Sequence, residues 1–104
     1  IIAELRALNR SLKRGFEFYF YRKDDDQEVD LIIERPGMPL ALVEIKSYQE
    51  IEEQHLSTLA KVSEIYPEAE VYCLSMDRIE RKFGRIRSLP WKQGIAALGL
   101  GTSA

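Results

Sequence analysis

Apolar positions follow a helical period at the start of the chain and a strand period soon after. Residues 1–12 carry apolar side chains three and four positions apart, which predicts an amphipathic helix. The aromatic run over 16–21 and the strict alternation over 28–34 predict two strands, and 40–46 predicts a third. Polar segments rich in turn-forming residues separate these runs and predict tight turns.

The helical period returns in the second half of the chain. Residues 49–66 place an apolar stripe on one face, and Pro67 ends that predicted helix. Pro90 is suited to the start of a last helix, because its fixed φ matches the first helical turn. The remaining expected elements are a short strand over 71–75, an edge strand over 83–89 and a helix over 91–98.

The expected order of elements is α-β-β-β-α-β-β-α, which indicates an α/β fold. Three strands joined by tight turns form an antiparallel meander, and the helix after them requires a parallel pairing of the third and fourth strands. We therefore expect a mixed sheet with helices on its faces. Residues 1–98 form the expected domain, and 99–104 form a flexible tail. The first helix begins without an N-cap residue, so we interpret it as truncated from a longer protein.

Composition narrows the class of protein rather than its activity. The 104 residues suit one domain, and 45% hydrophobic with 31% charged residues is typical of a soluble globular chain. No run approaches the ~20 apolar residues of a membrane helix, and no cleavable signal opens the chain. We expect a cytoplasmic, reducing setting without membrane contact.

Charge is unevenly distributed along the chain. The net charge of −2 argues against a dedicated nucleic-acid binder, although cations cluster over 10–14 and 78–87. The second cluster is suited either to a nucleic-acid backbone or to contact with another protein module, and both interpretations stay open. Cys73 is interpreted as a small buried hydrophobe and His55, the single histidine, as a packed structural residue.

Charged residues interrupt two strands that should be apolar on both faces. Glu44 and Lys46 lie two positions apart in the third strand, so their side chains share one face. Asp30 interrupts the neighbouring strand in the same way, and the turn over 35–39 can bring it beside Glu44. Two carboxylates and one ammonium group are therefore expected to converge at the middle of the sheet.

Such a cluster requires compensation for its charge. Buried charges are costly, and two close carboxylates repel each other. A divalent cation removes both problems, and hard oxygen ligands favour Mg²⁺. Lys46 is then placed to orient an attacking water or to stabilise developing negative charge. The same spacing equally supports a plain salt bridge between Lys46 and one acid, and this alternative stays open.

Val29-Asp30, a turn, and then Glu44-Ile45-Lys46 resemble the signature of the PD-(D/E)XK nuclease superfamily, with valine where the name has proline. The surrounding residues 20–22, 27–34 and 88–91 extend this likeness over nearly the whole chain. Together they resemble the C-terminal nuclease-like domain of uncharacterised bacterial and archaeal AAA-type ATPases. The resemblance implies a restriction-endonuclease-like mixed sheet.

The resemblance also assigns roles to individual residues. It implies that Asp30, Glu44 and Lys46 are catalytic, with the two acids as metal-binding carboxylates and Lys46 as the catalytic lysine. The carbonyl of Ile45 is a further implied ligand, and Glu4 matches an acid on the first helix that can complete the site. The implied cofactor is Mg²⁺ or Mn²⁺.

Two functions of different classes follow. The first is a Mg²⁺-dependent DNA endonuclease domain of a larger ATPase, and the second is a non-catalytic regulatory or interaction domain that retains the nuclease fold. The intact set of catalytic residues favours the first, and the acidic balance of the chain favours the second. The implied partners are DNA, the ATPase module of the same full-length chain and a second copy in a homodimer.

Overall fold

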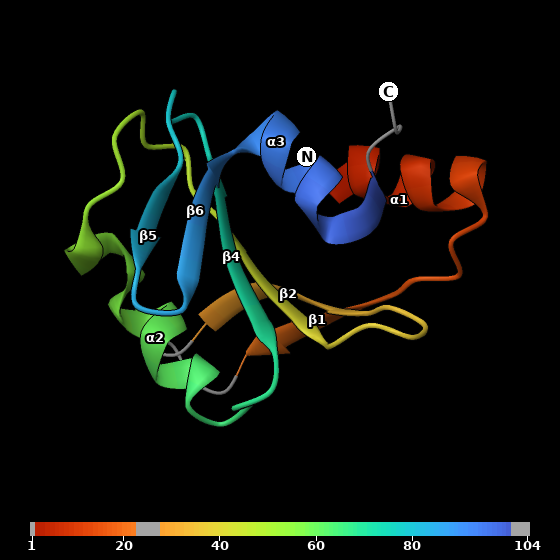
Figure 1. The fold of residues 1–104 in the computed structure, drawn as a ribbon, viewed down its shortest axis with the longest axis horizontal. Coiled ribbons are helices and arrows are strands. Elements are labelled where there is room, and N and C mark those ends of the chain that lie inside the picture. The colour runs from red at the N-terminus through yellow and green to blue at the C-terminus, as the bar shows by residue number, and fades with distance from the viewer. Residues whose placement is uncertain (1, 23–27, 101–104) are drawn as a thin grey trace.

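The computed structural model describes the backbone of residues 2–22 and 28–100 and the side chains of residues 3–19 and 31–100. This part of the chain forms a six-stranded mixed sheet with the strand order β1-β2-β3-β4-β6-β5. Helices lie on both sides of the sheet (Figure 1). The strands are β1 (Glu17–Arg22), β2 (Glu28–Glu34), β3 (Ala41–Ile45), β4 (Glu70–Ser75), β5 (Arg81–Phe83) and β6 (Ile86–Pro90). The helices are α1 (Ile2–Leu12), α2 (Ser57–Ser63) and α3 (Trp91–Ile95), with the short helical turns η1 (Glu53–Leu56) and η2 (Ala96–Leu100).

The sheet has an antiparallel half and a half that contains the parallel pairs. β1, β2 and β3 form the predicted meander, and β3 then pairs in parallel with β4 after the crossover through η1 and α2. β4 also pairs in parallel with β6, and β5 closes the sheet as an antiparallel edge strand. The mixed α/β architecture expected from the sequence is confirmed at this level.

Alternating side chains build one hydrophobic core on each face of the sheet. Leu31, Ile33 and Val43 belong to the first core, where α1, α3 and η2 cover the sheet. Leu42 and Cys73 belong to the second core, which α2 and η1 cover (Figure 1). Cys73 is fully buried, as its apolar surroundings in the sequence suggested. Each buried strand side chain in these two clusters can thus be assigned to one of two opposite faces.

The helix expected over 49–66 is shorter than predicted, because both of its ends are used for other bonds. The backbone N–H of Ile51 donates to the carboxylate of Asp77, and residues 49–52 form a bend and an irregular segment rather than a helix. Beyond Ser63 the chain continues in turns whose N–H groups bond three residues back, as at Tyr66 to Ser63. A regular apolar stripe therefore overstated the length of the helix.

The expected edge strand over 83–89 is instead a hairpin. Gly84 adopts a φ of +61° and reverses the chain between β5 and β6. β6 consequently lies inside the sheet between β4 and β5, and the short polar strand β5 is the edge. An edge strand is paired on one side only and lies next to solvent on the other. Polar side chains at 81–82 are therefore compatible with a strand at this position.

Two residues of the predicted tail, Gly99 and Leu100, lie within the described part of the chain. Pro90 stands at the N-cap of α3, at the start of the last helix as expected, and the chain continues through η2 to Leu100 with a kink at Gly99, where φ is +98°. Leu100 is fully buried in the first core, so Gly99 and Leu100 belong to the fold, while 101–104 lie outside the described residues. No helix in the described part of the chain is long and apolar enough to cross a membrane.

Candidate functional site

Glu44 is a buried carboxylate near the end of a central strand. It lies in β3 opposite Cys73 of β4, so it faces the second core together with Leu42. Only 5% of the residue is exposed to solvent. A carboxylate in such a position is stabilised only by a compensating charge or by hydrogen bonds.

Lys46 supplies a compensating charge. Its Nζ lies 2.7 Å from Oε1 of Glu44, and about a third of its side chain is exposed. The backbone N–H of Lys46 donates to the carbonyl of Leu74 at 2.9 Å, which continues the parallel ladder one residue beyond β3. The two-residue spacing thus places carboxylate and ammonium on one face, as the strand period predicts.

Asp30 lies in β2, the strand next to β3, and its side chain falls outside the described residues. The register of the two strands pairs Leu31 with Val43 and Ile32 with Leu42. Continued by one residue, this register sets the backbone of Asp30 opposite that of Glu44.

The other two candidate metal ligands lie elsewhere. Glu4 is exposed on α1, and its neighbour Leu5 packs in the first core, on the opposite face of the sheet from Glu44. The side chain of Ile45 packs against the same first core. Among the side chains that the structure describes, no group of three or more histidines, cysteines, aspartates or glutamates could hold a metal ion.

Asp77 is a buried acid beside this region that the sequence analysis did not single out. Its Oδ2 accepts hydrogen bonds from Arg81 Nε at 2.6 Å and from the Ile51 N–H at 3.0 Å, and its Oδ1 accepts one from the Ile79 N–H at 3.2 Å. The hydrogen bond from Arg81 is the main reason why the pKa of Asp77 falls from 3.8 to about 2. Asp77 therefore joins the loop after β3 to the loop after β4. In the sequence, Asp77 follows the end of a strand and lies two residues after Ser75, whose hydroxyl accepts from the Asp77 N–H. A serine and an aspartate at this spacing are common in turns, so the sequence indicates only weakly that Asp77 connects two loops.

Ser88 adds a polar group to the same face of the sheet. It pairs with Cys73 on one side and with Arg81 on the other, which places it in the row that begins at Glu44. Its hydroxyl is buried and has no hydrogen-bond partner within the described residues. Glu44, Ser88 and Arg81 therefore lie in one row across this face, with the apolar Cys73 between Glu44 and Ser88.

Residues 1–93 match the sequence model of a family described as a domain of unknown function, DUF4143. This chain belongs to the DUF4143 family. No curated protein matches it. Among solved structures, it is similar to a chain in the refined half-complex from the tetradecameric assembly of Thermococcus gammatolerans McrB AAA+ hexamers with bound McrC. The identity is 19%, the TM-score is 0.55, and the match covers 81% of this chain and 25% of that one.

This DUF4143 domain therefore spans a quarter of the length of the chain that it resembles, and at this identity the likeness concerns the fold. The family match includes every candidate residue from Glu4 to Lys46, as well as Asp77 and Ser88.

Three arginines of the basic cluster over 78–87 hold the DUF4143 fold together. Arg81 pairs with Asp77, and Arg87 pairs with Glu80 at 3.0 Å. Arg85 donates to the backbone carbonyls of Ser63, Tyr66 and Ala69 at the end of α2. These intramolecular bonds weaken the interpretation of the cluster as a nucleic-acid surface.

A second polar cluster lies around a buried arginine on the other half of the fold. Arg35 donates to the carbonyls of Pro39 and Leu98 and lies 2.6 Å from the carboxylate of Glu70. The hydrogen bond from Arg35 lowers the pKa of Glu70, and burial together with Glu70 raises the pKa of Tyr72. The acceptors of these Arg35 hydrogen bonds are all groups of the same chain, which indicates a structural role.

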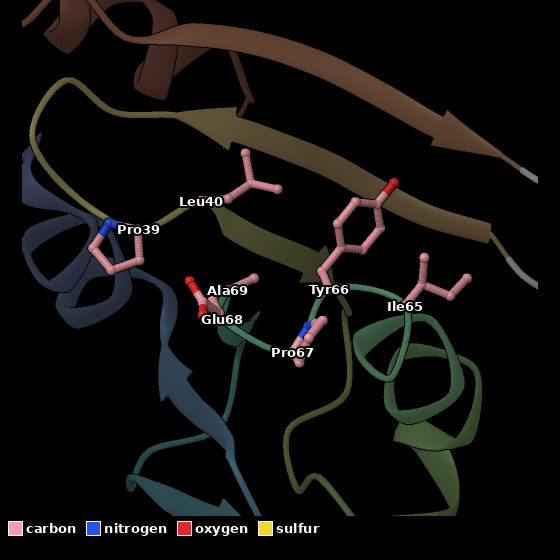
Figure 2. Close-up of a pocket in the computed structure, with 7 residues that line it drawn as sticks. All are labelled: Pro39, Leu40, Ile65, Tyr66, Pro67, Glu68 and Ala69. Atoms are coloured by element: carbon pink, nitrogen blue, oxygen red, sulfur yellow. The ribbon is translucent and has the colours of Figure 1, made fainter.

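A hollow of about 430 Å³ lies at the opposite end of β3 from Lys46. Its lining comes from Pro39 and Leu40 before β3 and from residues 65–69 between α2 and β4 (Figure 2). A second hollow of about 340 Å³ is lined in part by Leu56, Phe83 and Ile86. Neither hollow is lined by Glu44 or Lys46, so the candidate chemistry does not coincide with these cavities.

Proposed function

We propose that this DUF4143 domain is a metal-dependent nuclease domain that works as part of an AAA-type ATPase, with Asp30, Glu44 and Lys46 as its catalytic residues. The observation that carries the proposal is the burial of Glu44 at 5% exposure with Lys46 only 2.7 Å away. A buried carboxylate with its ion-pair partner is often no more stabilising than apolar residues of similar size, so stability alone does not account for Glu44 in the sheet.

The donor set suits a small, hard cation. Glu44 contributes carboxylate oxygen at the end of a central strand, and the β2–β3 register supports a second carboxylate from Asp30. Mg²⁺ takes one or two protein carboxylates and keeps several waters, so a third protein ligand is not required. The carbonyl of Ile45 and the carboxylate of Glu4 are further proposed ligands, although Glu4 would have to come from the opposite face. When bound, Mg²⁺ supplies Lewis acidity that makes water a nucleophile at neutral pH.

Lys46 has a distinct part in this proposal. Its ammonium group lies beside the carboxylate on a side chain that is about a third exposed, and from there it would reach a phosphate at the surface. In that position it neutralises charge that develops on the phosphodiester during attack. The ion pair with Glu44 would keep the ammonium group in position, because the two-residue spacing places both side chains on the same face of the sheet.

The ATPase part of the proposal draws on the structural neighbour. That protein belongs to an assembly of McrB AAA+ hexamers with bound McrC, and it shares its fold with this domain at a TM-score of 0.55. We infer that this domain is joined to an ATPase module of the same chain, and we further propose that it acts on DNA and that two copies form a homodimer. Such a module would also supply the substrate affinity that a net charge of −2 does not.

The second candidate function is a regulatory or interaction domain without catalysis. Two observations favour it: Lys46 already pairs with Glu44, and Arg81, Arg85 and Arg87 are engaged within the fold. In this case the former nuclease site has only a structural role.

Plasmid cleavage by the full-length protein distinguishes the two candidates. With Mn²⁺ or Mg²⁺ and ATP present, we expect cleavage that Lys46→Ala abolishes while metal binding remains, and that Asp30→Ala abolishes together with metal binding. Lys82→Ala is the matched control, because Lys82 is an exposed lysine on the edge strand β5. Absence of cleavage in every metal would favour the regulatory function, and cleavage unchanged by Lys46→Ala would identify a contaminant.

A further inference from the structure

An exposed aromatic ring follows the third strand, two residues after Lys46. Tyr48 is 47% exposed and stacks on His55, with ring centroids 3.9 Å apart and ring planes within 6° of parallel. His55 covers one face of the tyrosine ring, so the exposed area belongs to the other face and the edges. His55 is thus packed as the sequence suggested, but it packs against an exposed partner rather than within a core.

Hydrogen bonds hold both rings in place. The N–H of Glu52 donates to Nδ1 of His55 at 2.9 Å, which fixes the imidazole in the turn η1. The carbonyl of Tyr48 accepts from the N–H of Met76 at 3.2 Å, and Asp77 anchors the same loop through Ile51. The ring pair is therefore preorganised, which lowers the entropic cost of binding a ligand.

The charge around the rings is negative. Residues 47–54 contain no lysine or arginine, and Glu50, Glu52 and Glu53 are all exposed. Of the neighbouring cations, Lys46 and Arg81 lie in ion pairs with Glu44 and Asp77, and Arg78 is exposed on the adjoining loop, so three exposed glutamates face one exposed arginine. Phosphate groups are repelled by such surroundings, whereas a cation is attracted both by carboxylates and by the face of an aromatic ring.

We propose that Tyr48, His55, Glu50 and Glu53, the stacked-ring surface, bind a basic segment of a protein partner by taking an arginine over the open face of Tyr48. The planar guanidinium stacks on the ring and the glutamates meet its charge. Met76 and Ile79, which are 52% and 53% exposed on the adjoining loop, extend the surface with apolar contacts. The proposal does not depend on the nuclease function.

Titration of the chain with a hexa-arginine peptide, followed by NMR, tests this surface. We expect chemical-shift changes centred on residues 48–55 and, for Tyr48→Ala, about fivefold weaker binding or more, the range of a partly desolvated cation–π contact. Tyr48→Phe keeps the ring and should bind within about twofold of the native chain. Tyr19→Ala is the matched control, because Tyr19 is 49% exposed on the distant edge strand β1.

Charge on the surface is tested separately. The double variant Glu50→Gln/Glu53→Gln should weaken hexa-arginine binding at low salt, and circular dichroism should show the native fold for each variant. Equal binding by Tyr48→Ala and the native chain overturns the proposal, as does a lack of binding at millimolar peptide. A dodecamer of thymidylate that binds in a Tyr48-dependent manner also overturns it, because the surface would then stack nucleobases.

Discussion

Asp77 lies in surroundings that strongly favour its charged form. Arg81 and two backbone N–H groups donate to its carboxylate, and its pKa of about 2 reflects those bonds. Because the folded pKa lies below the ordinary 3.8, Asp77 contributes its full stability above that value. The contribution is lost as the pH falls through about 2, where the folded state also takes up the proton.

Asp77→Asn is therefore expected to lower the free energy of unfolding by about 1–3 kcal/mol at pH 7, since one charged acceptor is lost. The same variant should lose less stability than the native chain when the pH falls from 5 to 2. Urea denaturation at a series of pH values measures both effects. Parallel pH profiles for the two chains would contradict the role given to Asp77.

The Glu44–Lys46 pair permits a separate residue-scale test of function against stability. Replacing both residues, Glu44→Leu with Lys46→Met, removes the charge while filling a similar volume. We expect a free energy of unfolding within about 1 kcal/mol of the native value, because buried ion pairs and apolar residues of similar volume are often equivalent.

Calorimetry with Mn²⁺ should show that the same double variant no longer binds the metal. Binding that survives the substitution would place the ions elsewhere, for example at the three consecutive aspartates of residues 24–26, which lie outside the described residues.

At the scale of elements, α3 lies unusually close to the sheet. A Cβ added at Gly94 would come within 1.9 Å of a methyl carbon of Leu74, which is itself fully buried in β4. Because Leu74 is fully buried in a close-packed core, its side chain has to move to make room for the added carbon.

Gly94→Ala should accordingly destabilise the fold by about 1–3 kcal/mol, although alanine is the better helix former. Gly84→Asn is a suitable comparison, since nothing lies within 4 Å of the added Cβ there and asparagine tolerates a positive φ. Thermal unfolding of both variants measures these effects. A rise in Tm for Gly94→Ala would contradict the prediction, because it would show that α3 can shift away from β4 at little cost.

At the scale of the whole molecule, Arg35 connects parts of the chain that are distant in sequence. Its side chain is fully buried and reaches Leu98 in η2, Pro39 before β3 and Glu70 at the start of β4. The planar guanidinium group can serve these acceptors together, whereas an ammonium group is a single point of charge.

Arg35→Lys should therefore cost about 3 kcal/mol of unfolding free energy, within the range found when a buried charge network loses a partner. Arg87→Lys is the contrasting change, because its ion pair with Glu80 is about half exposed and should contribute less than about 1 kcal/mol. Similar losses for the two variants would argue against a special role for Arg35.

Local periodicity was enough to predict the meander, the parallel crossover and the shared face of Glu44 and Lys46, because the two-residue alternation of a strand is encoded by neighbours in sequence.

The tertiary structure alone decided which groups meet over long distances. It gave Asp77 its bonds to two loops, assigned Arg81, Arg85 and Arg87 to acceptors within the fold, and set Glu4 on the opposite face from Glu44. It also placed β6 inside the sheet and Leu100 in the core. The physical reason is that the sequence does not show whether a charged side chain will bond to water, to a distant carbonyl or to another charge. That partner is determined only when the chain packs and brings distant residues together.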